Sequence, residues 1–350
     1  MNNVYYQNKA NSNEPEKKTE KIIIIKDDDF KYKEMTKFFK ENHDMFFEKQ
    51  NVVGVGIGEK FKNGRNTGES CITFFVSQKL DASFLKDEDL ISESVSGFKT
   101  DVIEIGIIFA GGATAEDSIK ESLVSETLAQ RIRPAKGGYS VGHYQITAGT
   151  ISTIVYDSGS YGIPSKYYIL SNNHVLANSN NALIGDPILQ PGPYDGGTVS
   201  NDTIAYLTRY VPIKFKTATT APINYVDAAI AEGEFQDLNR EIYWIGYVNQ
   251  INSNPKVNDV VTKTGRTTNF STGTISSINA TVDVNYGGGL VARFANQIVT
   301  TFMTAGGDSG SLLCDINRNA VGLIFAGSST VSVANRIANV QSLLGIRLTP

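Results

Sequence analysis

The stretch GDSGSLLCDINRNAVGLIFAG, residues 307–327, places a serine between glycines directly before two short apolar runs. The runs at 310–314 and 320–326 are separated by polar residues typical of a turn, so the stretch predicts two neighbouring β-strands. Ser309 then lies at the beginning of the first strand. On its own, GDSGS is also compatible with an ordinary Gly/Ser hairpin turn.

The same pattern of short strands continues upstream over most of the chain. Between about residues 140 and 334 the sequence is rich in Gly, Thr, Ser, Asn and Val, with turn residues between alternating apolar positions. Such spacing indicates an all-β sandwich or a pair of barrels. One closing helix is predicted at Ala334–Leu344 from apolar residues at helical spacing. The remaining predicted strands are 148–156, 166–171, 203–211, 224–232, 259–264, 271–278, 280–285 and 297–302.

The N-terminal part has a different organisation, and residues 22–112 predict a small α/β domain. Residues 30–48 carry phenylalanine and methionine at helical spacing. Residues 51–57 and 71–76 predict a hairpin, and residues 100–108 predict another strand. The GVGIG run of the hairpin resembles a phosphate loop only superficially, because no Lys-Ser or Lys-Thr pair follows it. We interpret the run as a strand that packs closely against a helix.

Two flanking segments complete the predicted organisation. Residues 1–21 are polar and lack hydrophobic periodicity, which predicts a disordered tail. Residues 113–133 predict a linker helix that ends before Pro134. The strand-rich domain then spans residues 134–350. The predicted fold class is therefore mainly β, with two barrels preceded by the small α/β domain.

The composition of the chain argues against several classes of function. The chain has 350 residues with 32 basic and 36 acidic side chains, and its net charge of −4 argues against a nucleic-acid-binding surface. No apolar run approaches the roughly 20 residues of a membrane-spanning helix. No secretory signal is found, so we expect a cytoplasmic protein with two reduced cysteines, although export by a non-Sec route leaves no mark in the sequence. No zinc motif is present, and we expect no metal and no cofactor.

Catalysis by a serine would need a base and a site for the oxyanion, because a serine hydroxyl is inert at its free pKa. Gly307 and Ser309 could supply the two backbone N–H groups of an oxyanion hole, since a glycine does not obstruct the substrate. The base must be one of three histidines. His43 lies among phenylalanines of a predicted helix, and His143 could simply cap a strand. His174 stands where an apolar strand runs into a polar turn, so we expect it to face a cleft.

Asp227 is the candidate for the group that orients the histidine. It lies in the apolar run INYVDAAIAE (223–232), where a carboxylate is costly unless a partner such as an imidazole N–H neutralises it. Hydrogen bonds from nearby backbone N–H groups are the structural alternative. Asp186, Asp195 and Asp202 are rivals, but each lies in a polar or glycine-rich loop.

In chain order the three candidates are His174, Asp227 and Ser309, which is the order found in chymotrypsin-type enzymes. Seven sequence segments contain these residues or lie between and around them: RPAKGGYSVGH (133–143), LSNNHVLA (170–177), GDPILQPGPYDGG (185–197), VDAAIA (226–231), VTKTGRTT (261–268), GDSGSLL (307–313) and VGLIFAG (321–327). In these segments the sequence resembles trypsin-like serine peptidases of two-barrel fold, and among them the bacterial relatives of the plant narrow-leaf type. The resemblance implies a Ser-His-Asp endopeptidase with these three residues as the catalytic groups.

The chain departs from the digestive enzymes of this superfamily in two respects. Their disulfide framework is missing, and there is no Ile-Val-Gly-Gly start that a cut could release to pair with Asp308. We therefore do not expect activation by cleavage, and Asp308 needs another partner. In the trypsin-like pattern Met303 lies at the base of the primary specificity pocket, and Phe325, Ala326 and Gly327 form its wall. Because these residues include no carboxylate, we expect a preference for apolar or small side chains over Arg or Lys.

The main hypothesis is a serine endopeptidase that hydrolyses protein or peptide substrates through a triad and a backbone oxyanion hole. Its N-terminal domain would serve regulation, partner binding or assembly into a homo-oligomer. The alternative is a binding or scaffold protein that keeps the peptidase fold with little turnover. An esterase or acyl transferase using the same triad is chemically feasible, but the all-β pattern favours peptide hydrolysis.

Overall fold

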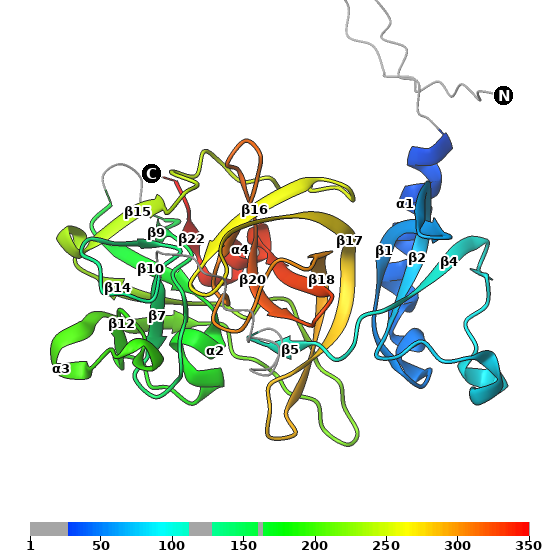
Figure 1. Ribbon diagram of the computed structural model, residues 1–350, viewed down its shortest axis with the longest axis horizontal. Coiled ribbons are helices and arrows are strands. Elements are labelled where there is room, and N and C mark those ends of the chain that lie inside the picture. The colour runs from blue at the N-terminus through cyan, green and yellow to red at the C-terminus, as the bar shows by residue number, and fades with distance from the viewer. Residues whose placement is uncertain (1–26, 112–127, 160–163, 350) are drawn as a thin grey trace, which may run out of the picture.

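The computed structural model describes residues 27–111, 128–159 and 164–349 (Figure 1). The predicted tail, residues 1–21, lies outside the described residues, and so does most of the predicted linker helix. Residues 128–133 of that linker are described, and they form a turn followed by residues in neither helix nor strand instead of the end of a helix.

The N-terminal part is an α/β unit in which one helix packs on a small sheet. Met35 and Phe39 of α1 pack with Val55 of β1 in one buried cluster. The hairpin is longer than expected, because Asn63 and Gly64 form a two-residue turn with positive φ. The elements are α1 (Asp27–Asn42), the 3₁₀ helices η1 (His43–Glu48), η2 (Ala82–Phe84) and η3 (Asp87–Asp89), and strands β1 (Val52–Lys62), β2 (Arg65–Val76), β3 (Ser94–Val95), β4 (Phe98–Glu104) and β5 (Phe109–Ala110).

An eight-stranded antiparallel sheet curls into the first barrel, with the order β22-β9-β10-β14-β12-β11-β7-β8. Backbone N–H groups of Ile151 and Ser152 donate to the carbonyls of Tyr139 and Leu170, which brings the ends of the sheet together. The elements are β7 (Ser140–His143), β8 (Gly149–Thr150), β9 (Ile154–Asp157), β10 (Tyr167–Ser171), α2 (Asn173–Leu176), η5 (Asn178–Asn180), β11 (Pro187–Leu189), η6 (Pro193–Asp195), α3 (Val199–Asp202), β12 (Thr203–Tyr210), β14 (Ala229–Gly233) and β22 (Ile346–Arg347).

The second barrel is a closed ring of strands. The strands β16, β17, β18, β21, β20 and β19 pair in this order, and β19 pairs again with β16. The expected mainly β fold with two barrels is therefore confirmed. The elements are β16 (Val260–Gly265), β17 (Asn269–Asn285), β18 (Val291–Thr301), β19 (Leu312–Asp315), β20 (Ala320–Gly327), β21 (Val331–Arg336) and α4 (Ile337–Leu344).

Three short strands and a 3₁₀ helix lie outside the ring. Strand β13 (Ile223–Asn224) pairs with β18, and β6 (Ala135–Gly137) pairs with β15 (Leu238–Ile242). The 3₁₀ helix η7 (Phe235–Asp237) precedes β15.

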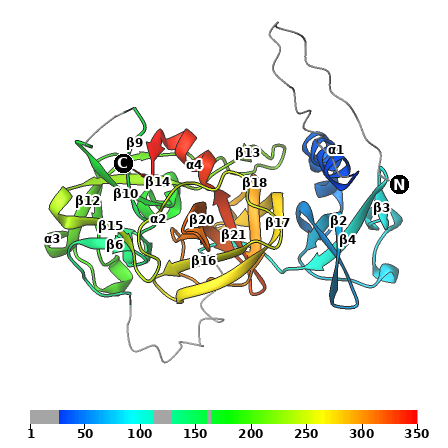
Figure 2. The same ribbon diagram turned by 90° about the horizontal axis from the view of Figure 1, so that it is seen from above.

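A buried apolar cluster joins the two barrels and helix α4, which lies across them in Figure 2. The cluster contains Val226 and Ala228 next to the first barrel, Leu312 of the second barrel and Ile337 of α4. Asp227 stands between two of these residues in the sequence. The fold therefore positions the Asp227 carboxylate at the junction of the two barrels.

The N-terminal unit shares one continuous sheet with the second barrel, because β1 pairs antiparallel with β17. The GVGIG run, residues 54–58, allows this close approach. A Cβ atom at Gly56 would lie 2.3 Å from Ser277 Oγ of β17. The run is a strand, as expected, but its glycines face the neighbouring strands, and only the alternate residues Val55 and Ile57 face the helix side.

Several strand predictions have wrong bounds. The predicted strand 100–108 is β4, which spans Phe98–Glu104. The predicted strands 271–278 and 280–285 form one long strand, β17, whose pairing with β18 shifts register near Asn279. The predicted strand 224–232 is divided into β13 and β14, because the backbone around Asp227 is not paired in a ladder.

The closing helix begins later than predicted. It starts at Ile337 instead of Ala334, because Ala334 still belongs to β21 and pairs with β18 and β20. Eight strands, β3, β5, β6, β7, β11, β15, β21 and β22, escaped the sequence prediction. All but β21 have five residues or fewer, which is too short for a clear alternating pattern, and β5, β6, β7, β11 and β22 also adjoin or contain a glycine or proline.

Neither cysteine is a candidate nucleophile. Cys71 and Cys314 are both buried free thiols. Burial raises the pKa of Cys71 to about 11 and that of Cys314 to about 12, so both thiols stay protonated at neutral pH. Among the described residues there is no helix long and apolar enough to cross a membrane.

Candidate active site

His174 lies in the short helix α2, directly after β10. The neighbouring side chains of this turn are buried and fixed: Asn172 donates to Asp227 O at 2.7 Å, and Asn173 donates to Val211 O at 2.8 Å. These bonds satisfy the amides that follow the apolar strand. They hold the turn so that the His174 ring points toward the junction of the barrels.

The Asp227 carboxylate is completely buried and bonds to His174 twice. His174 Nδ1 lies 2.6 Å from Asp227 Oδ2, and the His174 backbone N–H donates to Oδ1 at 3.1 Å. Because an ionised carboxylate can only accept, Nδ1 carries the proton and Nε2 is left as the basic nitrogen. The predicted pairing of these two residues is present in the structure.

Tyr286 is a third member of this group that the sequence did not point to. Its hydroxyl donates to Asp227 Oδ2 at 2.7 Å, and its ring meets the His174 ring edge to face at 6.1 Å. Burial, together with the Asp227 charge and hydrogen bond, raises the pKa of Tyr286 well above its usual value of 10.0. The hydroxyl therefore stays protonated and keeps donating. A tyrosine just beyond a strand, in NYGGG, carries no sequence signal for this role.

We expect Tyr286→Phe to lower kcat roughly tenfold or more, because Asp227 loses one charge-assisted hydrogen bond of about 1.5–3 kcal/mol. KM for a peptide should change little, because the hydroxyl bonds to Asp227 and not to substrate. The proton NMR resonance of the His174 Nδ1–H, far downfield in such a short bond, should also move. Tyr206→Phe, at an exposed tyrosine of β12, is the control. Equal kcat and an unmoved resonance in both variants would remove Tyr286 from the site.

Ser309 follows a tight turn that requires glycine at position 307. Asp308 N donates to Ala305 O at 3.0 Å, and Gly307 has φ +97°, which is typical of the third position of a type II turn. Gly310 also has φ +97°, and a Cβ there would lie 2.1 Å from Ser171 Oγ. The loop that carries Ser309 therefore packs directly on the end of β10, the strand that leads to His174.

The two predicted oxyanion N–H groups and the predicted base have no partners among the described residues. Neither Gly307 N nor Ser309 N donates to a described acceptor, and His174 Nε2 is buried without a hydrogen bond. Ser309 Oγ donates to Phe325 O at 3.3 Å instead of to His174. The structure thus brings the His174 and Ser309 segments together without a hydrogen bond between their side chains.

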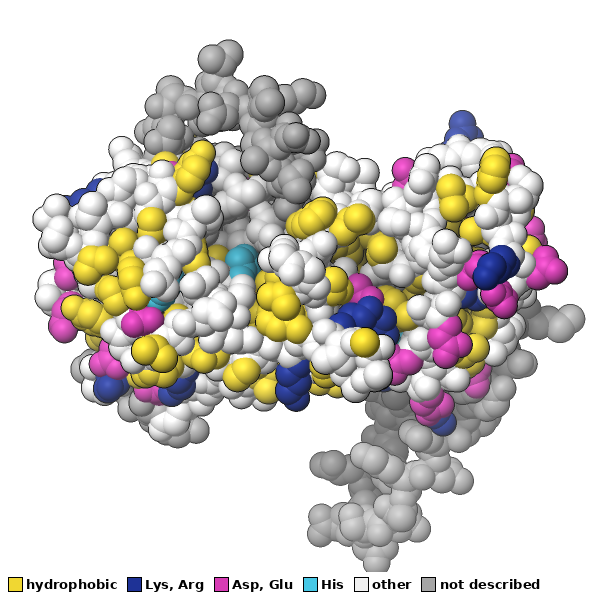
Figure 3. Space-filling model, turned by 90° about the horizontal axis from the view of Figure 1, so that it is seen from below, with side chains coloured by type: hydrophobic (Ala, Val, Ile, Leu, Met, Phe, Trp, Pro, Cys, Tyr) yellow, Lys and Arg dark blue, Asp and Glu magenta, His cyan; other side chains and the backbone are white. Residues whose placement is uncertain are grey.

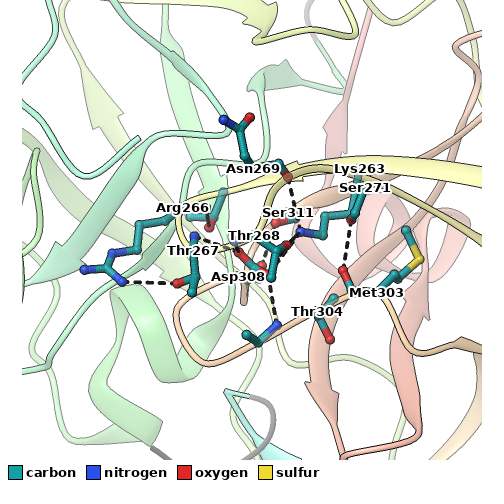
Figure 4. A network of polar contacts seen from close by, with 12 residues as sticks. Lys263, Arg266, Thr267, Thr268, Asn269, Ser271, Met303, Thr304, Asp308 and Ser311 are labelled. Atoms are coloured by element: carbon teal, nitrogen blue, oxygen red, sulfur yellow. Dashed lines mark hydrogen bonds and ion pairs between the residues drawn. The ribbon is translucent and has the colours of Figure 1, made fainter. Parts of the chain in front are cut away.

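Asp308 finds its partner in Lys263 of β16 (Figure 4). Both side chains are fully buried, with Lys263 Nζ 3.0 Å from Asp308 Oδ2. Burial alone would raise the pKa of Asp308, but the Lys263 charge and hydrogen bonds from Thr268, Ala305 and Thr267 outweigh it and hold the pKa below 3.8. Lys263 is therefore the partner that Asp308 needs, and this pair fixes the turn before Ser309.

We expect Lys263→Met to lower the free energy of unfolding by about 3–5 kcal/mol, because it leaves a buried carboxylate without its cation. Denaturant unfolding at neutral pH measures this loss. Replacing both partners, Lys263→Met with Asp308→Asn, should recover most of it. Lys166→Met breaks an exposed pair with Glu232 at 2.9 Å and should cost less than about 1 kcal/mol. A loss no larger than in this control would contradict the role of Lys263.

The pH dependence of this pair follows from the lowered pKa of Asp308. The unfolded carboxyl titrates near 3.8, and the folded one titrates below it. The stabilisation is therefore complete above the unfolded value and decreases as the pH falls through the folded value.

The rival histidines and aspartates have structural partners. His143 is buried and bonds to Asp186 at 3.1 Å, and His43 Nδ1 lies 3.2 Å from two helix carbonyls. Asp202 accepts from Thr198 N at 2.9 Å. Asp195 pairs with Arg266, whose Nε donates at 2.9 Å. This last pair links the QPGPYDGG loop to the turn that packs on Gly307, so Arg266 anchors a loop next to the candidate oxyanion site.

The predicted pocket residues are divided between two core clusters. Met303 packs with Ile324 in one cluster, whereas Phe325 and Ala326 belong to another. At the predicted pocket wall, a Cβ on Gly327 would lie 3.3 Å from Thr304 Oγ1. Thr304 Oγ1 in turn lies 2.7 Å from Ser332 Oγ, and both side chains are buried. The side chains next to Gly327 are thus small and uncharged, and the pocket itself stays a prediction.

On the face of the molecule drawn in Figure 3, histidine atoms are visible among hydrophobic and uncharged side chains. Among the described residues, no group of three or more His, Cys, Asp or Glu side chains is arranged to hold a metal ion.

No family profile matches the sequence, and no curated protein matches it. The solved structures similar to this one are trypsin-like serine proteases of chymotrypsin fold. Thermobifida fusca protease A is 18% identical (TM-score 0.42; 61% of this chain, 96% of that one). Nocardiopsis protease is 14% identical (0.41; 61% and 97%), and Cellulomonas bogoriensis chymotrypsin 17% (0.40; 61% and 97%). At such low identity, the functional conclusion depends on the geometry of the site itself.

Proposed function

We propose that this chain is a serine endopeptidase in which Ser309, His174 and Asp227 act together. The observation that carries the proposal is the 2.6 Å bond from His174 Nδ1 to Asp227, with Nε2 left without a described partner. A general base needs one fixed nitrogen and one free lone pair, and the imidazole has both.

The reaction follows the acyl-enzyme sequence of such triads. When a peptide carbonyl arrives, Ser309 Oγ leaves Phe325 O and donates to His174 Nε2. Oγ attacks the carbonyl carbon while His174 takes the proton, and His174 then gives that proton to the leaving amine. Water, activated by the same imidazole, hydrolyses the acyl-enzyme. Asp227 stays ionised and stabilises the imidazolium that forms in each step.

The developing negative charge on the substrate oxygen needs donors that are already in place. The N–H groups of Gly307 and Ser309 fit this role because nothing else in the described chain accepts from them. One lost donor of this kind costs about 3–4 kcal/mol in comparable enzymes. The Lys263–Asp308 pair positions these donors by fixing the turn between them.

Small side chains before the cut are the preferred substrate class. The uncharged Thr304 and Ser332 beside Gly327 leave no carboxylate to bind Arg or Lys. We propose that Met303, Phe325 and Ala326 contribute to the same preference, as the sequence predicts.

A binding or scaffold protein is the second candidate, and one observation favours it. Ser309 Oγ donates to Phe325 O, so in this conformation the nucleophile does not touch the base. In that case the site would bind peptides without cutting them.

Digestion of an unfolded protein mixture separates the two candidates. Long incubation with wild type should give new peptide termini, identified by mass spectrometry, that are absent with Ser309→Ala. The new C-terminal residues should be small. Equal, background levels of new termini with the two proteins would contradict the peptidase and leave the binding protein.

A further inference from the structure

The edge of strand β20 next to Ser309 is covered by the chain's own N-terminal unit. On this side of β20, β19 pairs only as far as Leu323. The nucleophile loop then takes over, since Gly310 N donates to Ile324 O at 2.9 Å and Ile324 N donates to Ser311 O at 3.0 Å. Beyond Ile324, the edge has no partner from the second barrel.

Strand β5 fills this remaining edge, as Figure 1 shows beside β20. It runs antiparallel to β20, with Ala110 opposite Ala326 and Phe109 opposite Gly327. Gly111 N donates to Phe325 O at 3.1 Å, which is the same carbonyl that accepts from Ser309 Oγ at 3.3 Å. The strand therefore leads directly to the nucleophile and ends there.

An extended peptide substrate needs an edge of this kind. Peptides bind sheet edges by adding a strand, and the backbone bonds set the register in which a carbonyl reaches the nucleophile. Among the described residues, the β20 edge from Phe325 to Gly327 is the strand edge that leads up to Ser309. A substrate on the acyl side of the cut must pair where β5 now pairs.

We propose that β5 occupies the substrate-binding edge as a built-in substrate mimic, so that extended peptides bind only after β5 has left. The proposal rests on the proposed function and adds its regulation and its ligand class. The ligand is an extended peptide whose residues next to the cut are small, as in Phe109-Ala110-Gly111. The N-terminal unit therefore competes with peptide substrates for the β20 edge.

Packing holds β5 in place on both sides. Ile105 and Ile108 are buried in the cluster that contains Phe325. Asn285 N donates to Ile108 O at 2.9 Å, and Asn285 directly precedes Tyr286, which holds Asp227. Thr330 Oγ1 donates to Ile105 O at 3.3 Å. The mimic is therefore built into the core, and its release requires that these contacts open.

Gly111 distinguishes the mimic from a substrate in a productive pose. Its φ is +88°, so the chain leaves the extended conformation at the residue next to Ser309. No Cβ contact within 4 Å forces a glycine here, so the turn itself is the reason for glycine. An extended substrate would instead continue straight past the nucleophile.

Gly111→Pro tests the proposal through peptide hydrolysis. Proline removes the N–H that bonds to Phe325 O, and its φ near −65° cannot match the turn. In wild type, a peptide binds only to the fraction of molecules in which β5 has left the edge, so the apparent affinity for the peptide is reduced by that fraction. Proline at position 111 should increase this fraction, and we expect kcat/KM of the variant to be roughly tenfold higher than that of wild type. Gly97→Pro is the matched control, since Gly97 has φ +82° in the exposed β3–β4 turn. Equal kcat/KM in wild type and Gly111→Pro would overturn the proposal.

A second measurement uses the unaltered chain and does not depend on the variant folding. A peptidyl boronate that ends in Ala-Gly is added until mass spectrometry shows its adduct on Ser309, and amide hydrogen exchange is then followed. Faster exchange of residues 105–111 in the adduct is the expected result. Unchanged protection of these amides in the adduct would overturn the proposal.

The proposed function is tested separately in the same samples. A fluorophosphonate probe is small enough to reach Ser309 without a strand partner. Labelling of Ser309 together with either negative result above rejects only the mimic. Absence of labelling rejects the peptidase itself.

Discussion

Replacing His174 by alanine should lower kcat for peptide hydrolysis by roughly 10⁴–10⁶, because the serine hydroxyl loses its base. The ring is oriented by the 2.6 Å bond to Asp227, and its second nitrogen has no other described partner. Stopped assays with high enzyme concentration and a fluorogenic peptide measure the residual rate. The fold should persist, since the ring is partly exposed at the junction of the barrels.

His143→Gln and His43→Gln are the matched controls. His143 bonds to Asp186, and His43 bonds to carbonyls of its own helix, so neither has a route to Ser309. Both variants should keep most of the activity. A folded His143→Gln protein as inactive as His174→Ala would assign the base to the wrong histidine.

Asp227→Asn should lower kcat by roughly 10⁴ while the shape of the side chain is kept. The amide can donate to Nδ1, which would favour the imidazole tautomer with its proton on Nε2, where it cannot act as a base. KM should change much less than kcat, because Asp227 lies behind His174 and is fully buried. Steady-state kinetics over a range of peptide concentrations separate the two constants.

Asp186→Asn, Asp195→Asn and Asp202→Asn, made in parallel, should each keep activity within roughly tenfold. Asp186 and Asp202 serve local loop bonds, and Asp195 serves the Arg266 anchor. If Asp186→Asn lost activity while Asp227→Asn worked normally, Asp227 would be a structural carboxylate.

The sequence predicted the mainly β fold because its strands alternate clearly, but the bounds of several elements depend on tertiary contacts. Asp227 interrupts an apolar run whose composition is that of one strand, and its hydrogen bonds with His174 and Tyr286 explain why the backbone leaves the ladder there. In the same way, Ala334 has helical spacing with the residues after it, yet pairing with β18 and β20 makes it a strand residue.

The candidate site was predictable where a residue type is rare and not where it is common. With three histidines, His174 could be found by elimination and context. Tyr286 is one of 16 tyrosines, and Lys263 is one of many lysines, so nothing in the sequence marks their bonds to Asp227 and Asp308. The pairing of β5 with β20 joins residues more than two hundred positions apart, and such contacts leave no local pattern.

The most direct test of the account is whether Ser309 is an activated nucleophile. The full-length protein is incubated with a fluorophosphonate probe, and the labelled residue is identified by peptide mass spectrometry. The account predicts a single label on Ser309, no label on Ser309→Ala, and labelling of His174→Ala slowed by orders of magnitude. A folded wild-type protein that stays unlabelled, or one labelled equally fast with and without His174, would contradict it.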